Sequence, residues 1–323
     1  MLFLNREDMQ KCISFEECIN AMEKAYRIFY DNNFAMPHRP CIENGTNTLL
    51  YMPCFTDEGF GTKFLTLFPE NPKNNKPMID GMMMLNDAQD GSIKVIMHAG
   101  YLTALRTAAN TGLMLKTLAP TDAKTCGIAG AGTQGAFQVA FACTVRDIET
   151  VYVYDPYLKD KNKFTQAVEK LLGKKPQFVF CDDVTEFINK SDIIIAATTS
   201  SSPVFPDEEK LYTGKTIVAI GSYKPHVREC PDAVVKAADG IYVDLDFAKE
   251  ESGDLFIPLE NGITGHSKIH QLSDVLYNPD YKNHISGKTV FIKTVGMALF
   301  DVVSANQIYK NAVSKNIGTY LEF

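Results

Sequence analysis

Apolar residues recur with two spacings along the first 115 or so residues. Alternation, or a short apolar run between turn residues, predicts strands at 1–4, 48–52, 60–68, 82–86 and 93–98. Recurrence every three or four residues predicts a helix that Ser14 caps and a second helix at 102–118 that Pro120 ends. Strands and helices mixed in this way indicate an α+β domain.

From residue 124 the pattern changes to strand, turn, helix and strand. An apolar run at 125–129 leads into three glycines at the G-x-G-x-x-G spacing, and an apolar helical run follows at 136–145. The order predicts a dinucleotide-binding turn. Gly130 permits the tight turn, Gly132 lets a pyrophosphate approach the backbone, and Gly135 lets helix and strand pack closely. The predicted cofactor-binding residues of this turn are Gly130, Ala131, Gly132, Thr133, Gln134 and Gly135.

Asp155 ends the second strand of this segment, 20 residues after Gly135. A carboxylate there accepts hydrogen bonds from ribose hydroxyls and repels a 2′-phosphate. The sequence therefore predicts NAD as the cofactor in preference to NADP.

Further strands, predicted at 177–181, 192–197, 216–221, 240–244 and 289–293, alternate with helical segments. This alternation predicts an α/β fold with a doubly wound parallel sheet of the Rossmann type. The tail, 296–323, is predicted to be helical and to pack back onto the first domain. The prediction is a Rossmann domain at 117–297, inserted into an α+β domain formed by 1–116 with 298–323.

Composition and charge exclude several classes of protein. Of 323 residues, 45% are hydrophobic and 22% charged, as in ordinary globular proteins, and the net charge of −7 without a basic tract argues against nucleic-acid binding. No run of about 18 apolar residues exists to span a membrane, and Arg6 to Asp8 bring charge too early for a signal peptide. The eight cysteines are scattered singly, which predicts reduced thiols in a cytoplasmic protein.

Three cations in the first domain lie in unusual surroundings. Arg39 is held in a proline-rich turn, Lys63 lies in an apolar strand, and Arg106 has small or apolar neighbours. Each alone could be a surface cation or a structurally paired one. Together, beside a nucleotide domain, they predict a small carboxylate-bearing substrate, since Arg binds carboxylates bidentately and Lys can protonate a reacting nitrogen. His266 and His270 have helical metal-ligand spacing but lack a third ligand, so no metal is predicted.

The sequence resembles the ornithine cyclodeaminase/mu-crystallin family over nearly its whole length. The run around Arg106 is the most specific piece of this resemblance. The stretches that carry it are 37–40, 51–53, 61–63, 68–72, 85–87, Gly91, 103–109, the Gly130 turn, 196–200, 221–222, Pro225, 228–229 and 294–298.

The resemblance implies a homodimer in which the first domain and the C-terminal helix build the dimer interface and the substrate site. It implies that Arg39 and Arg106 hold the substrate carboxylate and that Lys63 lies beside the reacting amine or imine carbon. Tyr223 would be a further substrate contact. Further cofactor contacts are expected at Thr107, Thr198, Thr199, Ser222, Val295 and Gly296.

Two departures from the cyclodeaminases bear on the reaction. Tyr223 stands where those enzymes have an aspartate that handles protons, and Leu50 stands where ornithine cyclodeaminases have a second acid. A tyrosine is a poor base at neutral pH. Lys293 could either change the contacts with the cofactor or point to solvent.

Three functions follow from these observations. The favoured one is an NAD(P)-dependent oxidoreductase that acts on a small amino or imino acid, as an imine or ketimine reductase or an amino-acid dehydrogenase. The second is an ornithine cyclodeaminase, which forms L-proline and ammonia from L-ornithine without net consumption of the cofactor. The third is a non-enzymatic NAD(P)-dependent binder of a small ligand, against which the retention of Arg39, Lys63 and Arg106 counts.

Overall fold

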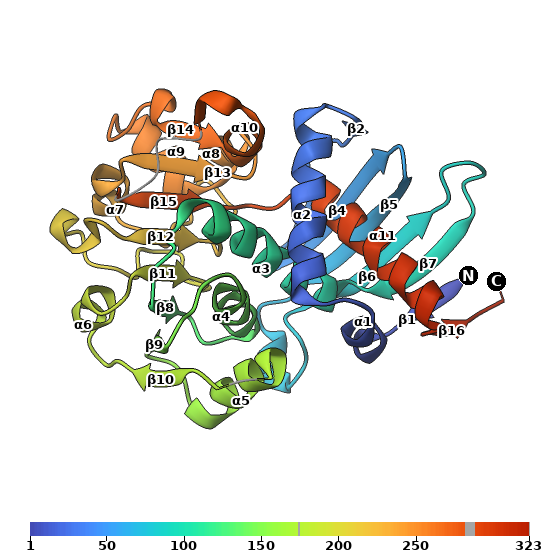
Figure 1. Cartoon of the computed structure of the whole chain (residues 1–323), viewed down its shortest axis with the longest axis horizontal. Helices are drawn as coiled ribbons and strands as arrows, with labels where there is room; N and C mark the ends of the chain where they lie inside the picture. Colours follow the sequence, from blue (N-terminus) through green and yellow to red (C-terminus); the bar gives the residue numbers. More distant parts are fainter. Residues whose placement is uncertain (174, 282–287, 323) are drawn as a thin grey trace. The chain divides into compact units, whose positions relative to one another are not determined.

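The chain forms two compact units (Figure 1). The computed structural model describes residues 1–173, 175–281 and 288–322. Unit 1 comprises Met1–Ala109 and Met297–Phe323, and unit 2 comprises Asn110–Gly296. The first break falls between Ala109 and Asn110, inside the helix α3 (Ala99–Leu118), and the boundary that the sequence predicted between residues 116 and 117 lies in the same helix.

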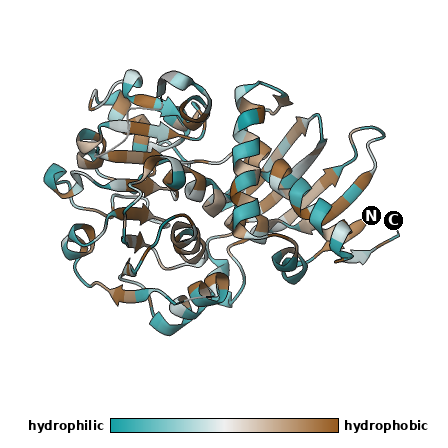
Figure 2. Ribbon diagram, in the orientation of Figure 1, coloured by the Kyte–Doolittle hydropathy of each residue, from teal (hydrophilic) through white to brown (hydrophobic). Residues whose placement is uncertain are grey.

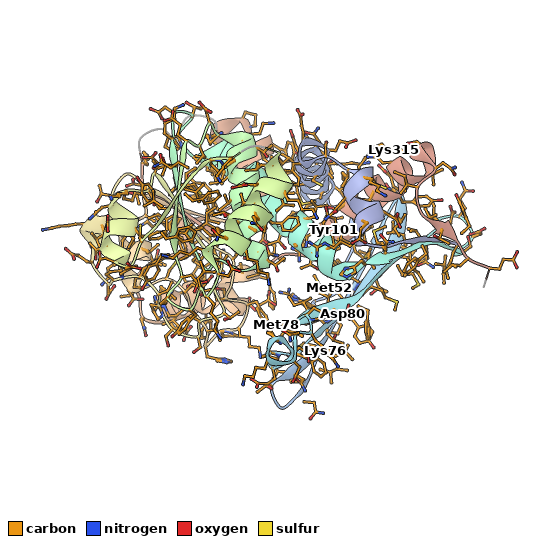
Figure 3. All side chains as sticks on the ribbon, turned by 90° about the horizontal axis from the view of Figure 1, so that it is seen from below. Met52, Lys76, Met78, Asp80, Tyr101 and Lys315 are labelled. Carbon is orange, nitrogen blue, oxygen red and sulfur yellow. The ribbon has the colours of Figure 1, made fainter. Side chains whose placement is uncertain are left out.

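Unit 1 is built on a mixed sheet with the strand order β16-β1-β7-β6-β5-β4-β2, in which β3 also pairs with β4. β1 runs parallel to β7, and the other described pairs are antiparallel. The strands are β1 (Leu2–Leu4), β2 (Phe34–Ala35), β3 (Cys41–Asn44), β4 (Asn47–Thr56), β5 (Gly59–Leu67), β6 (Ile79–Asn86), β7 (Ile93–His98) and β16 (Thr319–Tyr320). The 3₁₀ turn η1 (Asn71–Asn74) precedes the bend through Lys76 and Met78 into β6 (Figure 3).

One face of this sheet is buried under helices. Residues of β5 alternate strictly between buried and half-buried from Gly59 to Leu65, as expected for a strand with one covered face. The helices α2 (Phe15–Tyr30) and α11 (Ala298–Lys315) cover that face (Figure 1), and Tyr26 packs edge-on against Phe300 at 5.1 Å between ring centroids. Lys315, near the end of α11 (Figure 3), donates to the last carbonyls of α1 (Arg6–Cys12).

The prediction that the tail is helical over 296–323 is wrong for its last residues. The helix α11 stops at Lys315 because Asn316 (φ 52°) takes the left-handed conformation that ends helices, and Gly318 (φ 106°) turns the chain again. The chain then forms β16, which runs antiparallel to β1. The tail thereby closes one edge of the unit 1 sheet.

Unit 2 is an all-parallel sheet with the order β10-β9-β8-β11-β12-β15-β13-β14, which confirms the predicted Rossmann-type fold. Its central strands are buried throughout, because helices cover both faces; Figure 2 shows them mostly in hydrophobic colours. The strands are β8 (Thr125–Ala129), β9 (Thr150–Tyr154), β10 (Gln177–Phe180), β11 (Ile193–Ala196), β12 (Thr216–Ala219), β13 (Gly240–Val243), β14 (Ile269–Gln271) and β15 (Val290–Lys293).

The helices of unit 2 connect these strands. In order they are α4 (Thr133–Val145), α5 (Lys161–Leu172), α6 (Val184–Asn189), η2 (Glu209–Tyr212), α7 (Asp232–Ala237), α8 (Ala248–Glu251), α9 (Gly253–Glu260), η3 (His266–Lys268), α10 (Leu272–Tyr277) and η4 (Pro279–Tyr281). The pair His266 and His270 lies in η3 and β14, so these histidines do not share one helix. No group of three or more metal-ligating side chains occurs among the described residues. Within the same residues, no helix is long and apolar enough to cross a membrane.

Candidate active site

The most unusual residue of unit 1 is Lys63, which lies on the covered face of β5 and has no exposed surface. Its strand neighbours in the sheet are Met52 and Met83, both buried, and Met52 is seen in Figure 3. A lysine with a buried ammonium loses its hydration and needs a partner inside the protein.

Asp301 supplies that partner from the first turn of α11. Lys63 Nζ donates to Asp301 Oδ1 at 2.7 Å, and Arg106 Nε, from α3, donates to the same oxygen at 2.9 Å. Asp301 is fully buried and only 7% of the Arg106 side chain is exposed. The three residues, which we call the cation–carboxylate cluster, come from a strand and two helices that are distant in the sequence.

The cluster changes the acidity of Lys63. Burial lowers the pKa of Lys63 from its ordinary 10.5 to about 7; the charges of Arg106 and Arg39 act in the same direction, while Asp301 opposes them. Both protonation states of the amine are therefore present near neutral pH, which suits a group that gives up a proton during a reaction and then regains one.

Arg39 lies between β2 and β3 and is half-buried. It acts on Lys63 through its charge. With Arg39 and Arg106 against the single charge of Asp301, the surroundings of Lys63 carry excess positive charge, which favours binding of an anion.

The glycine turn of unit 2 has the form that the sequence predicts. Gly130 has φ 94°, and a side chain there would meet the carbonyl oxygen of Ala197 at 2.6 Å. A side chain on Gly135 would meet the carbonyl oxygen of Gly130 at 2.1 Å, whereas one on Gly132 would meet nothing within 4 Å. Gly132 is also the N-cap of α4 and provides no side-chain cap, so the start of the helix suits a pyrophosphate.

Asp155 is tied to this turn by a hydrogen bond. Its Oδ2 accepts from the backbone N–H of Ala131 at 2.9 Å, and its Oδ1 accepts from that of Tyr157 at 2.9 Å. Asp155 follows β9 directly and is half-buried. The carboxylate is thus fixed beside the turn, where a ribose would accompany a pyrophosphate.

A second buried network joins the loops that follow β11 and β12. Glu229 accepts from the backbone N–H and the hydroxyl of Thr198 at 2.6 and 2.9 Å, and from the backbone N–H of Gly221 at 2.5 Å. Asp254 accepts from the hydroxyl of Ser222 at 2.6 Å. Burial raises the pKa of Glu229, although the charge of Lys293 opposes the shift. This network fixes the predicted cofactor residues Thr198 and Ser222.

Lys293 does not point to solvent. It is fully buried, and its Nζ lies 3.2 Å from Asp254 Oδ2. Beyond it, Val295 and Gly296 donate their backbone N–H groups to Asp244 Oδ2 at 3.0 and 2.6 Å.

Of the remaining predicted residues, Tyr223 is half-buried in the loop after β12, and Thr199 is exposed in the loop after β11. Thr133 and Gln134 begin α4. Thr107 follows Arg106 on α3 and belongs to unit 1.

Asp301 is the functional candidate that the sequence analysis missed. It stands between Phe300 and Val302 in an otherwise apolar stretch of the predicted tail helix. A lone carboxylate on an apolar helix face is the signal that could have identified it.

Comparison with known proteins decides the family. Residues 1–316 match the profile of the ornithine cyclodeaminase/mu-crystallin family. The chain belongs to this family. It is accordingly an NAD(P)-dependent oxidoreductase that acts on amino or imino acids.

Relatives in this family match the chain from end to end. A Δ1-pyrroline-2-carboxylate reductase of Bacillus cereus is 34% identical over 331 residues, covering 100% of both chains. An alanine dehydrogenase of Archaeoglobus fulgidus is 30% identical over 325 residues, covering 100% of this chain and 98% of the relative. The structure of Δ1-pyrroline-2-carboxylate reductase from Thermococcus litoralis, in complex with NADH and L-proline, has a TM-score of 0.91 and 32% identity, covering 99% of this chain and 100% of that one.

Proposed function

We propose that this family member reduces a small cyclic imino acid of the Δ1-pyrroline-2-carboxylate type with NADH. The observation that carries the proposal is the cation–carboxylate cluster, in which a buried lysine with a pKa near neutrality lies next to an arginine on a shared carboxylate oxygen. Such a site offers one group that binds a carboxylate and one that protonates a nitrogen.

In this proposal the substrate carboxylate binds to Arg106 and Arg39. Lys63 donates a proton to the imine nitrogen, which makes the adjacent carbon electrophilic. That carbon accepts a hydride, the C=N bond becomes a C–N bond, and Lys63 regains a proton from water. One hydride and one proton are consumed for each secondary amine formed.

The residues of unit 2 fit a dinucleotide. The Gly130–Gly135 turn and the start of α4 would hold the pyrophosphate, with Thr198, Thr199, Ser222, Val295 and Gly296 as further contacts, and Thr107 of unit 1 as another. When bound, the reduced cofactor supplies the hydride. We further propose NAD rather than NADP, because the carboxylate of Asp155 would repel a 2′-phosphate.

The relatives support these proposals. Several of the matching curated proteins are Δ1-pyrroline-2-carboxylate reductases, and the Thermococcus litoralis structure contains NADH and L-proline. A solved archaeal alanine dehydrogenase, 29% identical to this chain with a TM-score of 0.90, is a dimer with bound NAD. We propose a homodimer for this protein as well, and we retain the cytoplasm as its predicted location.

Two rival activities are tested in the same assay. The alanine dehydrogenase relatives favour pyruvate with ammonia as an alternative substrate pair. A solved probable ornithine cyclodeaminase from Bordetella pertussis, 26% identical with a TM-score of 0.87, keeps cyclodeamination as a candidate. The buried Leu50 and the half-buried Tyr223, at the positions where cyclodeaminases carry acids, count against it.

The experiment follows NADH absorbance with purified protein and a panel of cyclic imino acids, with pyruvate plus ammonia, and with L-ornithine plus NAD assayed for ammonia. NADH oxidation that is fastest with a cyclic imino acid supports the proposal. Faster oxidation with pyruvate and ammonia identifies a dehydrogenase instead. Ammonia released from ornithine without net change in NADH identifies a cyclodeaminase.

A further inference from the structure

Asp301 is the buried carboxylate among the described residues of unit 1. Its Oδ1 accepts from both Lys63 Nζ and Arg106 Nε, and the whole residue is buried. Its Oδ2 is buried as well, with no hydrogen-bond partner among the described residues. One oxygen therefore orients two cations that have different tasks in the proposed reaction.

We propose that Asp301 is the positioning residue of the active site, which holds Lys63 in its proton-donating form and fixes the orientation of Arg106. The inference rests on the proposed function for the roles of Lys63 and Arg106. It goes beyond that function because it assigns to a residue of α11 the control of the protonation state of Lys63.

The geometry explains why a carboxylate is needed at this place. A side chain that accepted hydrogen bonds without charge could orient Lys63, but it could not offset the positive charges around it. Those charges come from Arg106 on α3 and from Arg39 between β2 and β3. Cys54 on β4 is a further titratable neighbour of Asp301, and burial and the charge of Asp301 both raise its pKa. Asp301 is the group that opposes them.

The position on α11 adds to the orientation. Arg106 bonds to Asp301 through Nε, which fixes the plane of the guanidinium and therefore the directions of its two terminal NH₂ groups. A carboxylate substrate that binds to those groups is then placed in a fixed relation to Lys63 Nζ, because both cations share one oxygen atom. Positioning of this kind has a larger effect on the rate of the reaction than on the affinity for the substrate.

The test compares Asp301→Asn with the unchanged protein. Asparagine keeps the shape and one acceptor oxygen but removes the charge, so the pKa of Lys63 should fall further. The reductase is active with Lys63 protonated, so its kcat/KM is lost as pH rises through that pKa. We expect the midpoint of this loss to move to lower pH by about one unit or more, with at least about a fivefold lower kcat/KM at pH 7. Asp301→Glu, which restores the charge, should move the midpoint back.

Glu58→Gln is the matched control. Glu58 is a carboxylate that also pairs with a lysine of α11, Lys310, but it is partly exposed and bonds to Lys24 and Asn306 rather than to the cluster. Its removal should leave the pH midpoint unchanged. An Asp301→Asn variant that is folded, slow and unshifted in its pH profile would show that Asp301 has a purely structural role.

A second measurement separates this inference from the proposed function. Urea unfolding of Asp301→Asn and of Asp301→Asn with Lys63→Met, at several pH values, gives the folded-state pKa of Lys63 without any substrate. If the unchanged protein reduces no imino acid, the proposed function fails, yet a lowered Lys63 pKa in the variant still supports the role of Asp301. An unchanged Lys63 pKa overturns the inference even if imine reduction is found.

Discussion

Replacement of Lys63 by methionine should stabilise the fold while it removes catalysis. Methionine fills a similar volume between Met52 and Met83 on the covered face of β5 and carries no charge to bury. Without a proton donor, kcat should fall by about 10² to 10⁴. Stability and activity should therefore change in opposite directions at one position.

The gain in stability depends on pH. The folded-state pKa of Lys63 is lowered from 10.5 to about 7, so the fold carries the whole cost of burying the charge below about pH 7. Between pH 7 and 10.5 the unfolded chain holds a proton that the folded chain lacks, and stability rises with pH. At about 1.4 kcal/mol per pH unit, the cost is about 5 kcal/mol at pH 6 and about 2 kcal/mol at pH 9. Loss of the hydrogen bond to Asp301 offsets about 1 kcal/mol of the gain at each pH.

The assay is urea unfolding of both proteins at pH 6, 7, 8 and 9, with the free energy of unfolding extrapolated to water. The variant should be more stable by about 4 kcal/mol at pH 6 and by about 1 kcal/mol at pH 9, and the difference of about 3 kcal/mol between these values is the decisive quantity. A stability difference that stays constant from pH 6 to pH 9 would refute the reasoning, because it would mean that folded Lys63 keeps its proton over this whole range and that its pKa is not lowered.

Four other substitutions test the remaining assignments. Arg106→Lys keeps the charge but loses the planar fork, and should raise the KM for the imino acid about 10- to 100-fold with the Kd of NADH unchanged. Gly132→Ala should leave the urea midpoint unchanged and weaken NADH binding at least about tenfold, whereas Gly130→Ala should destabilise the fold by about 1–3 kcal/mol, because of its positive φ and its approach to Ala197. Asp155→Asn keeps an acceptor for the turn but not the charge, so the ratio of kcat/KM with NADH to that with NADPH should fall at least about tenfold.

The parallel sheet of unit 2 could be predicted because its signals are local. The strand β11 is a continuous apolar run and β12 is apolar after Thr216, as expected for strands that are covered on both faces, and the glycine spacing after β8 marks the turn directly. The short strands β2, β3, β14 and β16 were not predicted, since two to four residues hold too little pattern. Their pairing depends on partners elsewhere in the chain.

Some residues of the active site could be selected from the sequence and others could not. Lys63 and Arg106 could be selected because a cation among apolar or small residues is visible in a short window of sequence, and Arg39 because it lies in a proline-rich turn. Their shared partner could not be selected in this way, since Asp301 follows Lys63 by 238 residues and no local period connects the two. Whether Lys293 points to solvent could not be predicted for the same reason, since its partner Asp254 lies on α9, distant in the sequence.

The interrupted course of unit 1 has a consequence for the order in which the protein matures. Residues 110–296 leave the ribosome as one continuous stretch, so unit 2 can fold while α11 is still being made. Until α11 arrives, Lys63 and Arg106 lack their carboxylate, and we expect both cations to stay hydrated. Limited proteolysis of a chain that stops at Gly296 should spare unit 2 and degrade unit 1. A nascent chain would then have a folded nucleotide-binding unit before the cation–carboxylate cluster is complete. The addition of α11 would be the step that completes the active site.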